Sequence, residues 1–158
     1  MVSFLLTAYD GVSRRFHVDA LRECFLSPYD VHDVFMLPCN TSMKVKLTST
    51  KRKDNPDVEL VQLWKEQFGL TGNQELYAET IYNEMIAMTD GGDDFKWFFV
   101  LYAFGTLLAP TPHNMVDLHL LKAVQNVEEI REQDWCDYVL LKLGVAIDYW
   151  ICSCIIQK

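Results

Sequence analysis

The sequence lacks several features that would assign it to a protein class directly. No apolar run reaches the roughly 20 residues of a membrane-spanning helix, and no basic-then-apolar leader opens the chain. The five cysteines show no paired spacing, which argues against a secreted disulfide framework and against a zinc site. We therefore expect free thiols, no bound metal, no contact with membranes, and a nuclear or cytoplasmic location.

Phosphate-binding and catalytic motifs are missing as well. The glycine pair Gly91-Gly92 is followed by Asp93-Asp94, whose charges would repel a phosphate at the helix start. The fragment Asp134-Trp135-Cys136 is faintly similar to a protease motif, but it has no glycine-rich turn behind it. A capping aspartate and a core tryptophan explain it more simply. The sequence predicts no enzyme activity, no catalytic residue and no cofactor.

What the chain has in abundance is acidic and apolar residues. Its 158 residues carry 22 acidic and 14 basic side chains, for a net charge of −8, and 50% of them are hydrophobic. This length favours one domain with its own core, so we expect residues 1–158 to fold as a single unit. The start Met1-Val-Ser-Phe-Leu-Leu looks like a cut into an existing element, so we also expect a fragment of a longer protein. The negative charge makes nucleic acid an unfavourable partner, because phosphate backbones are bound largely by basic side chains.

The first third of the chain predicts a small β-hairpin followed by a helix. Residues 16–18 and 24–26 have the pattern of two short strands. The run Ser27-Pro28-Tyr29-Asp30 has a capping serine, a proline at the first helical position and an acid three residues after the cap. We expect this helix to end before Pro38. Its inward-facing residues are predicted to be Val31, Val34 and Phe35.

Three weaker expectations concern the neighbouring segments. Residues 4–9 have the pattern of a helical tail that ends at the turn signal Asp10-Gly11. Residues 43–47 alternate in a way that predicts a third strand, and residues 48–54 read as an exposed basic loop.

Helical periodicity dominates the rest of the sequence. One helix begins at Asn55-Pro56 and ends at Gly69, and a second carries Ile81 on its buried face. The very apolar residues 95–109 predict a central buried helix, followed by short helices near residues 118–130. A long last helix is expected after Asp134, with a buried stripe of Trp135, Tyr138, Val139, Leu143, Ala146, Ile147, Trp150 and Cys154. The predicted fold class is mainly α (α+β), a helical domain with a small β-hairpin near the N-terminus.

The order of these motifs resembles a known family. The hairpin and helix of residues 16–38, the apolar run 98–110 and Trp135-Cys136 are similar to the plant mobile domain, also called aminotransferase-like. That family is related to the N-terminal regions of plant transposon-encoded proteins with a SUMO-protease-like domain. Met36 departs from it, because the family usually has glycine there. The resemblance implies protein contacts in transposon-derived or genome-silencing proteins, and none of the protease residues lies in this chain.

These observations predict a non-catalytic protein–protein interaction domain whose partner carries a basic segment. The candidate surface positions are Tyr29, His32, Lys44, Lys46, Lys51, Arg52 and Lys53. One alternative is a nucleic-acid-binding module that uses the hairpin, the first helix and the basic residues 44–53, which tight and steeply salt-dependent DNA binding would favour. Another is an enzyme with an unrecognised site, which a deep pocket with perturbed titratable groups would favour.

Overall fold

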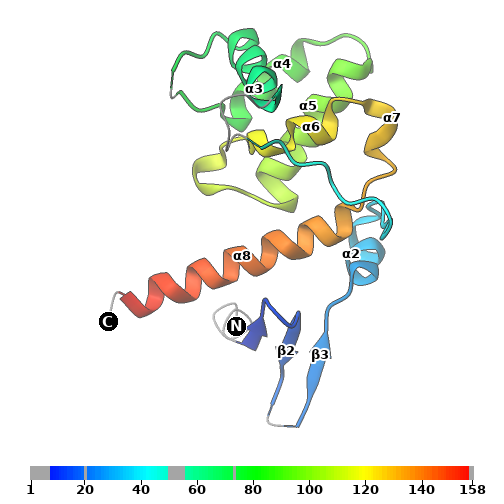
Figure 1. Ribbon diagram of the computed structural model, residues 1–158, viewed down its shortest axis with the longest axis vertical. Coiled ribbons are helices and arrows are strands. Elements are labelled where there is room, and N and C mark those ends of the chain that lie inside the picture. The colour runs from blue at the N-terminus through cyan, green and yellow to red at the C-terminus, as the bar shows by residue number, and fades with distance from the viewer. Residues whose placement is uncertain (1–7, 20, 50–55, 73, 157–158) are drawn as a thin grey trace. The chain divides into compact units, whose positions relative to one another are not determined.

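A computed structural model describes residues 8–19, 21–49, 56–72 and 74–156. The described part is mainly α-helical with one small antiparallel sheet near the N-terminus (Figure 1), which confirms the predicted fold class. The backbone divides into two compact units, Met1–Lys44 with Asp134–Lys158, and Val45–Gln133. The expectation that residues 1–158 fold as a single unit stays a prediction.

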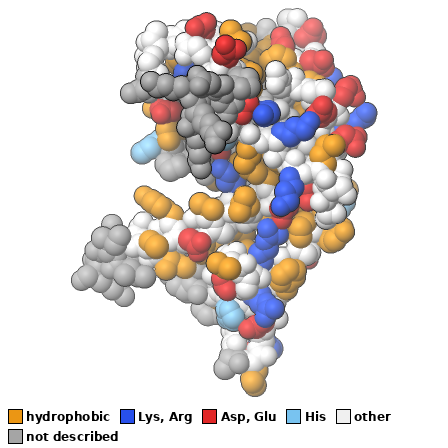
Figure 2. Space-filling view, viewed as in Figure 1, with side chains coloured by type: hydrophobic (Ala, Val, Ile, Leu, Met, Phe, Trp, Pro, Cys, Tyr) orange, Lys and Arg blue, Asp and Glu red, His pale blue; other side chains and the backbone are white. Residues whose placement is uncertain are grey.

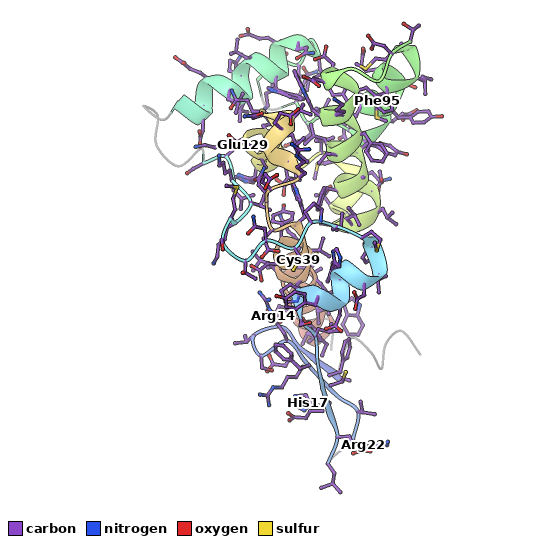
Figure 3. All side chains as sticks on the ribbon, turned by 90° about the vertical axis from the view of Figure 1, so that its right-hand side faces the viewer. Arg14, His17, Arg22, Cys39, Phe95 and Glu129 are labelled. Carbon is purple, nitrogen blue, oxygen red and sulfur yellow. The ribbon has the colours of Figure 1, made fainter. Side chains whose placement is uncertain are left out.

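The first unit contains a sheet of three short strands, β1 (Tyr9–Asp10), β2 (Arg15–His17) and β3 (Glu23–Phe25), in the order β1-β2-β3. The hairpin of β2 and β3 confirms the sequence prediction, with each strand beginning one residue earlier than expected. Arg14 lies at the base of this hairpin, and His17 and Arg22 lie toward its tip (Figure 3).

Two sequence predictions for this region, the helical tail at residues 4–9 and the strand at residues 43–47, are wrong for the residues that the structure describes. The predicted helical tail falls partly on residues 4–7, outside the described part, and Tyr9 pairs with Phe16 in the sheet instead. Residues 43–47 form no strand, because the chain there runs beside the start of the last helix. Lys44 makes an isolated bridge to Asp134, whose amide donates to the Met43 carbonyl at 2.7 Å.

The first described helix, α2 (Pro28–Phe35), begins with the predicted capping box. The Ser27 hydroxyl accepts from the Asp30 amide, and the Asp30 carboxylate accepts from the Ser27 amide at 2.7 Å. The helix ends at Met36, which adopts the left-handed conformation with φ 55°. Met36 is therefore a non-glycine residue in a conformation that glycine adopts more easily.

The helix α2 packs against α8 (Trp135–Ile156). Val31 is buried as predicted, but Val34 and Phe35 are 72% and 45% exposed, so their predicted inward orientation is wrong. The periodicity identified the apolar positions correctly. It could not show that Val31 would be the buried residue of this eight-residue helix.

The long helix α8 begins as predicted, since the Asp137 amide donates to the Asp134 carboxylate at 3.1 Å. Trp135, Tyr138, Val139 and Ile147 are buried, and Trp150 is half-buried. Leu143 and Ala146 are exposed, so the predicted stripe is too wide, and the Cys154 side chain lies outside the described part.

The β1–β2 turn lies close to α8 where Gly11 of the turn meets Gly144 of the helix. A Cβ atom on Gly11 would lie 3.0 Å from the Cα of Gly144, whereas a Cβ on Gly144 would lie 3.4 Å from the Gly11 carbonyl oxygen. Arg14 reaches the same helix, with its Nη1 2.7 Å from Oδ1 of Asp137. The backbone of the β1–β2 turn therefore rests directly on the helix backbone.

The second unit is built from helices α3 (Pro56–Gln67), α4 (Ala78–Ala87), α5 (Asp93–Ala103), α6 (Leu121–Val124) and α7 (Val127–Ile130). Gly69, with φ 64°, follows the end of α3 as predicted.

The predicted central helix corresponds to α5, which supplies the middle of the core of this unit. Phe98 and Leu101 are almost fully buried, as predicted, while Tyr102 is half-buried. The Trp64 ring meets the Phe98 ring edge-on at a centroid distance of 5.9 Å, and Trp97 lies 5.6 Å from Trp64. Aromatic burial of this kind dominates core energetics.

The buried side-chain amide of Gln133 holds the extended segment at the start of this unit, around Lys46. The side chain of Gln133 is fully buried, its Oε1 accepts from the Lys46 amide at 2.8 Å, and its Nε2 donates to the Ala123 carbonyl at 2.7 Å. Thr48, predicted to lie in an exposed loop, is buried because its hydroxyl accepts from the Lys122 amide at 3.0 Å. The composition of residues 48–54 is typical of a loop but could not reveal this contact.

The glycine contact leads to a paired prediction. Gly11→Ala should lower the free energy of unfolding by about 1–3 kcal/mol, because the new methyl group meets backbone that cannot rotate away. Gly144→Ala should change it little, since its contact is looser and alanine gains up to about 1 kcal/mol over glycine in a helix. Urea denaturation of both variants measures the difference. Equal effects would contradict the asymmetry of the contact.

The aromatic core gives a second prediction. Phe98→Ala should lower the free energy of unfolding by about 3–5 kcal/mol, because it leaves a cavity among packed rings. Phe99 is the matched control on the same helix, because it is 53% exposed. Phe99→Ala should cost about 1 kcal/mol or less. A thermal melt that is the same for wild type and Phe98→Ala would contradict the central place of α5.

Candidate functional site

The second unit has an open cleft of about 330 Å³, within the size range of ligand sites. We call it the tyrosine cleft. It is lined by Tyr77, Ala78, Glu79, Tyr82, Tyr102, Thr106, His113 and Asn114.

The first wall of the tyrosine cleft is the N-terminal part of α4. Tyr77 occupies the capping position, and Tyr82 lies in the second turn. Glu79 and Tyr82 are three residues apart, so they lie on one face of the helix as neighbours. Tyr77 is 48% and Tyr82 47% exposed. This wall therefore presents two partly exposed rings beside a carboxylate.

The second wall comes from the end of α5 and the π-helical segment η1 (Phe104–Leu108). The Tyr102 ring packs on the Tyr82 ring, with centroids 5.9 Å apart and planes 35° apart. Below it, the Thr106 hydroxyl donates to the Tyr102 carbonyl at 2.7 Å. The wide turn is closed by the Ala109 amide, which donates to the Phe104 carbonyl at 3.0 Å. Such π-helical turns occur frequently at functional sites.

The third wall is a tight turn with unusual backbone geometry. His113 and Asn114 are consecutive non-glycine residues with φ of 60° and 56°. Histidine and asparagine tolerate this left-handed region better than most residues, but it still costs free energy of order 1–3 kcal/mol for each strained residue. The Asn114 amide donates to the Thr111 carbonyl at 3.2 Å, and the Thr111 hydroxyl donates to the Met115 carbonyl. The surrounding contacts hold both side chains at the cleft.

The charge of the tyrosine cleft is negative. Glu79 is the one formally charged residue of its lining, which includes no lysine or arginine. Among the described residues the Glu79 carboxylate forms no ion pair, in contrast to Asp57, which lies 3.1 Å from Lys122 Nζ. Rings with an electron-rich face next to a carboxylate favour a cation.

Two cysteines of the first unit, Cys39 and Cys136, are poor nucleophiles. Burial raises the pKa of the Cys136 thiol to about 12, and burial also raises the pKa of Cys39. Since the thiolate is the reactive form, neither side chain is activated. Among the residues that the structure describes, histidine, cysteine and acidic side chains form no cluster of three or more that could hold a metal ion.

The described residues among those predicted as a binding surface differ in exposure. Tyr29 is 63% exposed on α2, whereas the nearby His32 ring is half-buried and donates through Nδ1 to the Leu37 carbonyl at 2.6 Å. His32 therefore stabilises the end of α2. Lys44 is exposed.

In the second unit Lys46 forms an ion pair with Glu129, which is labelled in Figure 3. Its charge is thus compensated. Lys51, Arg52 and Lys53 lie outside the described residues. The predicted basic surface therefore stays a prediction.

Sequence reasoning missed the tyrosine cleft because Tyr77 and Tyr102 lie in helical segments with apolar periodicity. Such periodicity does not distinguish a buried ring from one at the rim of a cleft. His113 is exposed. The pair His113-Asn114 after Pro112 could have indicated a tight turn, because histidine and asparagine adopt the left-handed conformation more readily than most residues.

Together these features define a mainly α protein with a small antiparallel sheet and an aromatic, carboxylate-bearing cleft. The chain belongs to the family described as a domain of unknown function, DUF8566, whose model matches residues 1–153. No curated protein and no solved structure matches the chain.

The family match corrects the resemblance to the plant mobile domain, which is wrong. The match over residues 1–153 is to DUF8566, and no plant mobile domain family is found. The motifs that suggested the resemblance are a capping box and an apolar helix. Both follow from general rules of helix formation and so occur in unrelated folds.

The apolar helices were also compared with the requirements of a membrane crossing. None of the helices in the described ranges is long and apolar enough to make one.

The strained turn yields a third prediction. His113→Val should lower the free energy of unfolding by about 1–2 kcal/mol, because a β-branched residue is strongly disfavoured at positive φ. His113→Gly should leave stability unchanged or raise it, since glycine adopts this conformation without steric cost. Thermal melts of the two variants provide the comparison. A valine variant as stable as the glycine variant would show that the turn is not strained.

Proposed function

We propose that this protein is a non-catalytic protein-interaction domain, and that the tyrosine cleft holds a cationic side chain of a basic segment in its partner. The observation that carries the proposal is the pairing of the exposed Tyr82 ring with the Glu79 carboxylate on one face of α4. A lysine or arginine over the ring face gains a cation–π interaction, and the carboxylate compensates its charge.

The net charge of the protein supports the same kind of partner. At −8 the molecule attracts positively charged segments over distances of about a Debye length, which is about 8 Å at physiological salt. The same charge disfavours a nucleic acid. The ion pair of Lys46 with Glu129 compensates one of the basic charges on which the nucleic-acid alternative depends.

The chemistry of the candidate nucleophiles supports a non-catalytic role. The half-buried Cys39 thiol and the buried Cys136 thiol have raised pKa values. No cysteine or serine lines the tyrosine cleft, and the hydroxyl of its one threonine, Thr106, donates to the Tyr102 carbonyl at 2.7 Å. Nucleophilic catalysis requires an activated nucleophile and a base within reach of it.

A titration with defined peptides tests the proposal. The probes are an uncharged glycine–serine peptide with three lysines or arginines inserted, and the same peptide with glutamate at those positions. We expect the basic peptides to bind ¹⁵N-labelled protein and to shift the amide signals of Glu79 and Tyr82. The acidic peptide should not bind.

Two variants on α4 separate a specific cleft from general charge. Glu79→Gln should weaken binding about two- to fivefold, the size of an exposed ion pair, because the Tyr82 ring stays in place. Glu84→Gln removes the same charge from an exposed position of the same helix outside the cleft, and it should change affinity less than twofold. Equal effects of the two variants would contradict the cleft, and so would preferential binding of duplex DNA.

A further inference from the structure

Two cysteine thiols of the first unit meet at the start of α8. Cys39, labelled in Figure 3, follows the end of α2, and Cys136 lies in the first turn of α8. Both thiols are free, and they share a side-chain hydrogen bond. Residues 40–135 separate the two cysteines in the sequence, so the tertiary structure alone brings them together.

The backbone around the two cysteines holds them in this position. Cys39 follows Pro38 in the chain. The Pro38 carbonyl accepts from the Trp135 amide at 3.1 Å and from the Cys136 amide at 3.4 Å. The Cys136 thiol donates to the Leu37 carbonyl at 3.4 Å. Because the first amides of a helix have no acceptor within the helix, these carbonyls satisfy the start of α8 and keep Cys39 beside Cys136.

The two thiols differ in reactivity. Cys39 is half-buried, so its sulfur can be reached from solvent, whereas Cys136 is fully buried. Burial raises the pKa of both thiols, but their shared hydrogen bond lowers the pKa of Cys39 and raises that of Cys136. The raised pKa values slow thiol–disulfide exchange without preventing it, because a small fraction of thiolate is always present. Cys39 is therefore the thiol that reacts first with an oxidant from solvent.

The charge near the pair selects the kind of oxidant. The Asp134 carboxylate lies close enough to raise the pKa of both thiols. It therefore also repels an anionic reagent at Cys39. An uncharged reagent is not repelled, and a small one reaches a half-buried sulfur more easily than a large one.

We propose that Cys39 and Cys136 form a reversible disulfide bond in exchange with a small uncharged disulfide, with Cys39 as the attacking thiol and Cys136 as the resolving thiol. The Cys39 thiolate attacks one sulfur of the small disulfide and releases one small thiol, which takes the proton that Cys39 lost. The Cys136 thiolate then attacks the Cys39 sulfur and releases the second small thiol, which takes the proton from Cys136. Two protein thiols are oxidised, and one small disulfide is reduced to two thiols.

This bond closes residues 40–135 into one covalent loop. The loop contains the whole second unit, Val45–Gln133. The chain leaves the first unit after Lys44 and returns to it at Asp134, where the Asp134 amide donates to the Met43 carbonyl at 2.7 Å. A disulfide restricts the unfolded chain more when the loop that it closes is longer. Oxidation should therefore stabilise the fold.

Equilibration of the full chain with 2-hydroxyethyl disulfide and 2-mercaptoethanol tests the bond. After alkylation of the remaining thiols, peptide mass spectrometry should find Cys39 linked to Cys136. The thermal unfolding midpoint should rise by roughly 5–15 °C over that of the protein kept in dithiothreitol. Cys24→Ser is the matched control, because Cys24 is an exposed cysteine of the same unit, and it should show the same link and the same rise.

Two further variants test the order of the steps. Cys136→Ser should accumulate the mixed disulfide at Cys39, because the resolving thiol is missing. Cys39→Ser should leave the buried Cys136 unmodified and should lose the rise of the midpoint.

The linkage in the wild-type protein decides the proposal even where a variant does not fold. A folded wild type without the Cys39–Cys136 link at every ratio of disulfide to thiol would overturn the proposal. A modified Cys136 in folded Cys39→Ser would overturn the assigned order of attack. A linked wild type with an unchanged midpoint would overturn the stabilising effect of the loop.

Discussion

The second unit depends on the burial of α5. Phe98 and Leu101 are almost fully buried, and Phe98 meets the Trp64 ring, so helices far apart in the chain meet on one apolar helix. Removing this much apolar surface from water is the main favourable term in folding. The position of α5 also determines where the Tyr102 ring reaches the tyrosine cleft, because Tyr102 directly follows the buried Leu101.

The tyrosine cleft is a consequence of how α5 ends. The chain continues into the π-helical turn of residues 104–108 and then turns back through His113 and Asn114, whose strained backbone is held by its neighbours. The Val116 amide donates to the Leu76 carbonyl at 2.7 Å, which fastens this return beside the start of α4. A rigid core thus supports an irregular rim, and irregular segments on rigid scaffolds often carry function.

The tyrosine cleft offers aromatic faces and a carboxylate to a cation, an interaction that salt weakens.

Local signals in the sequence determined the ends of helices. Ser27-Pro28 and Asp134 begin helices and Gly69 follows one, because capping and left-handed preference act within a few residues. The sequence also marks the apolar helices. It did not show that Val34 and Phe35 would stay exposed, that Thr48 would be buried, or that Tyr82 and Tyr102 would meet across a cleft. Those outcomes depend on contacts between residues distant in sequence, which periodicity cannot specify and only the packing of the tertiary structure decides.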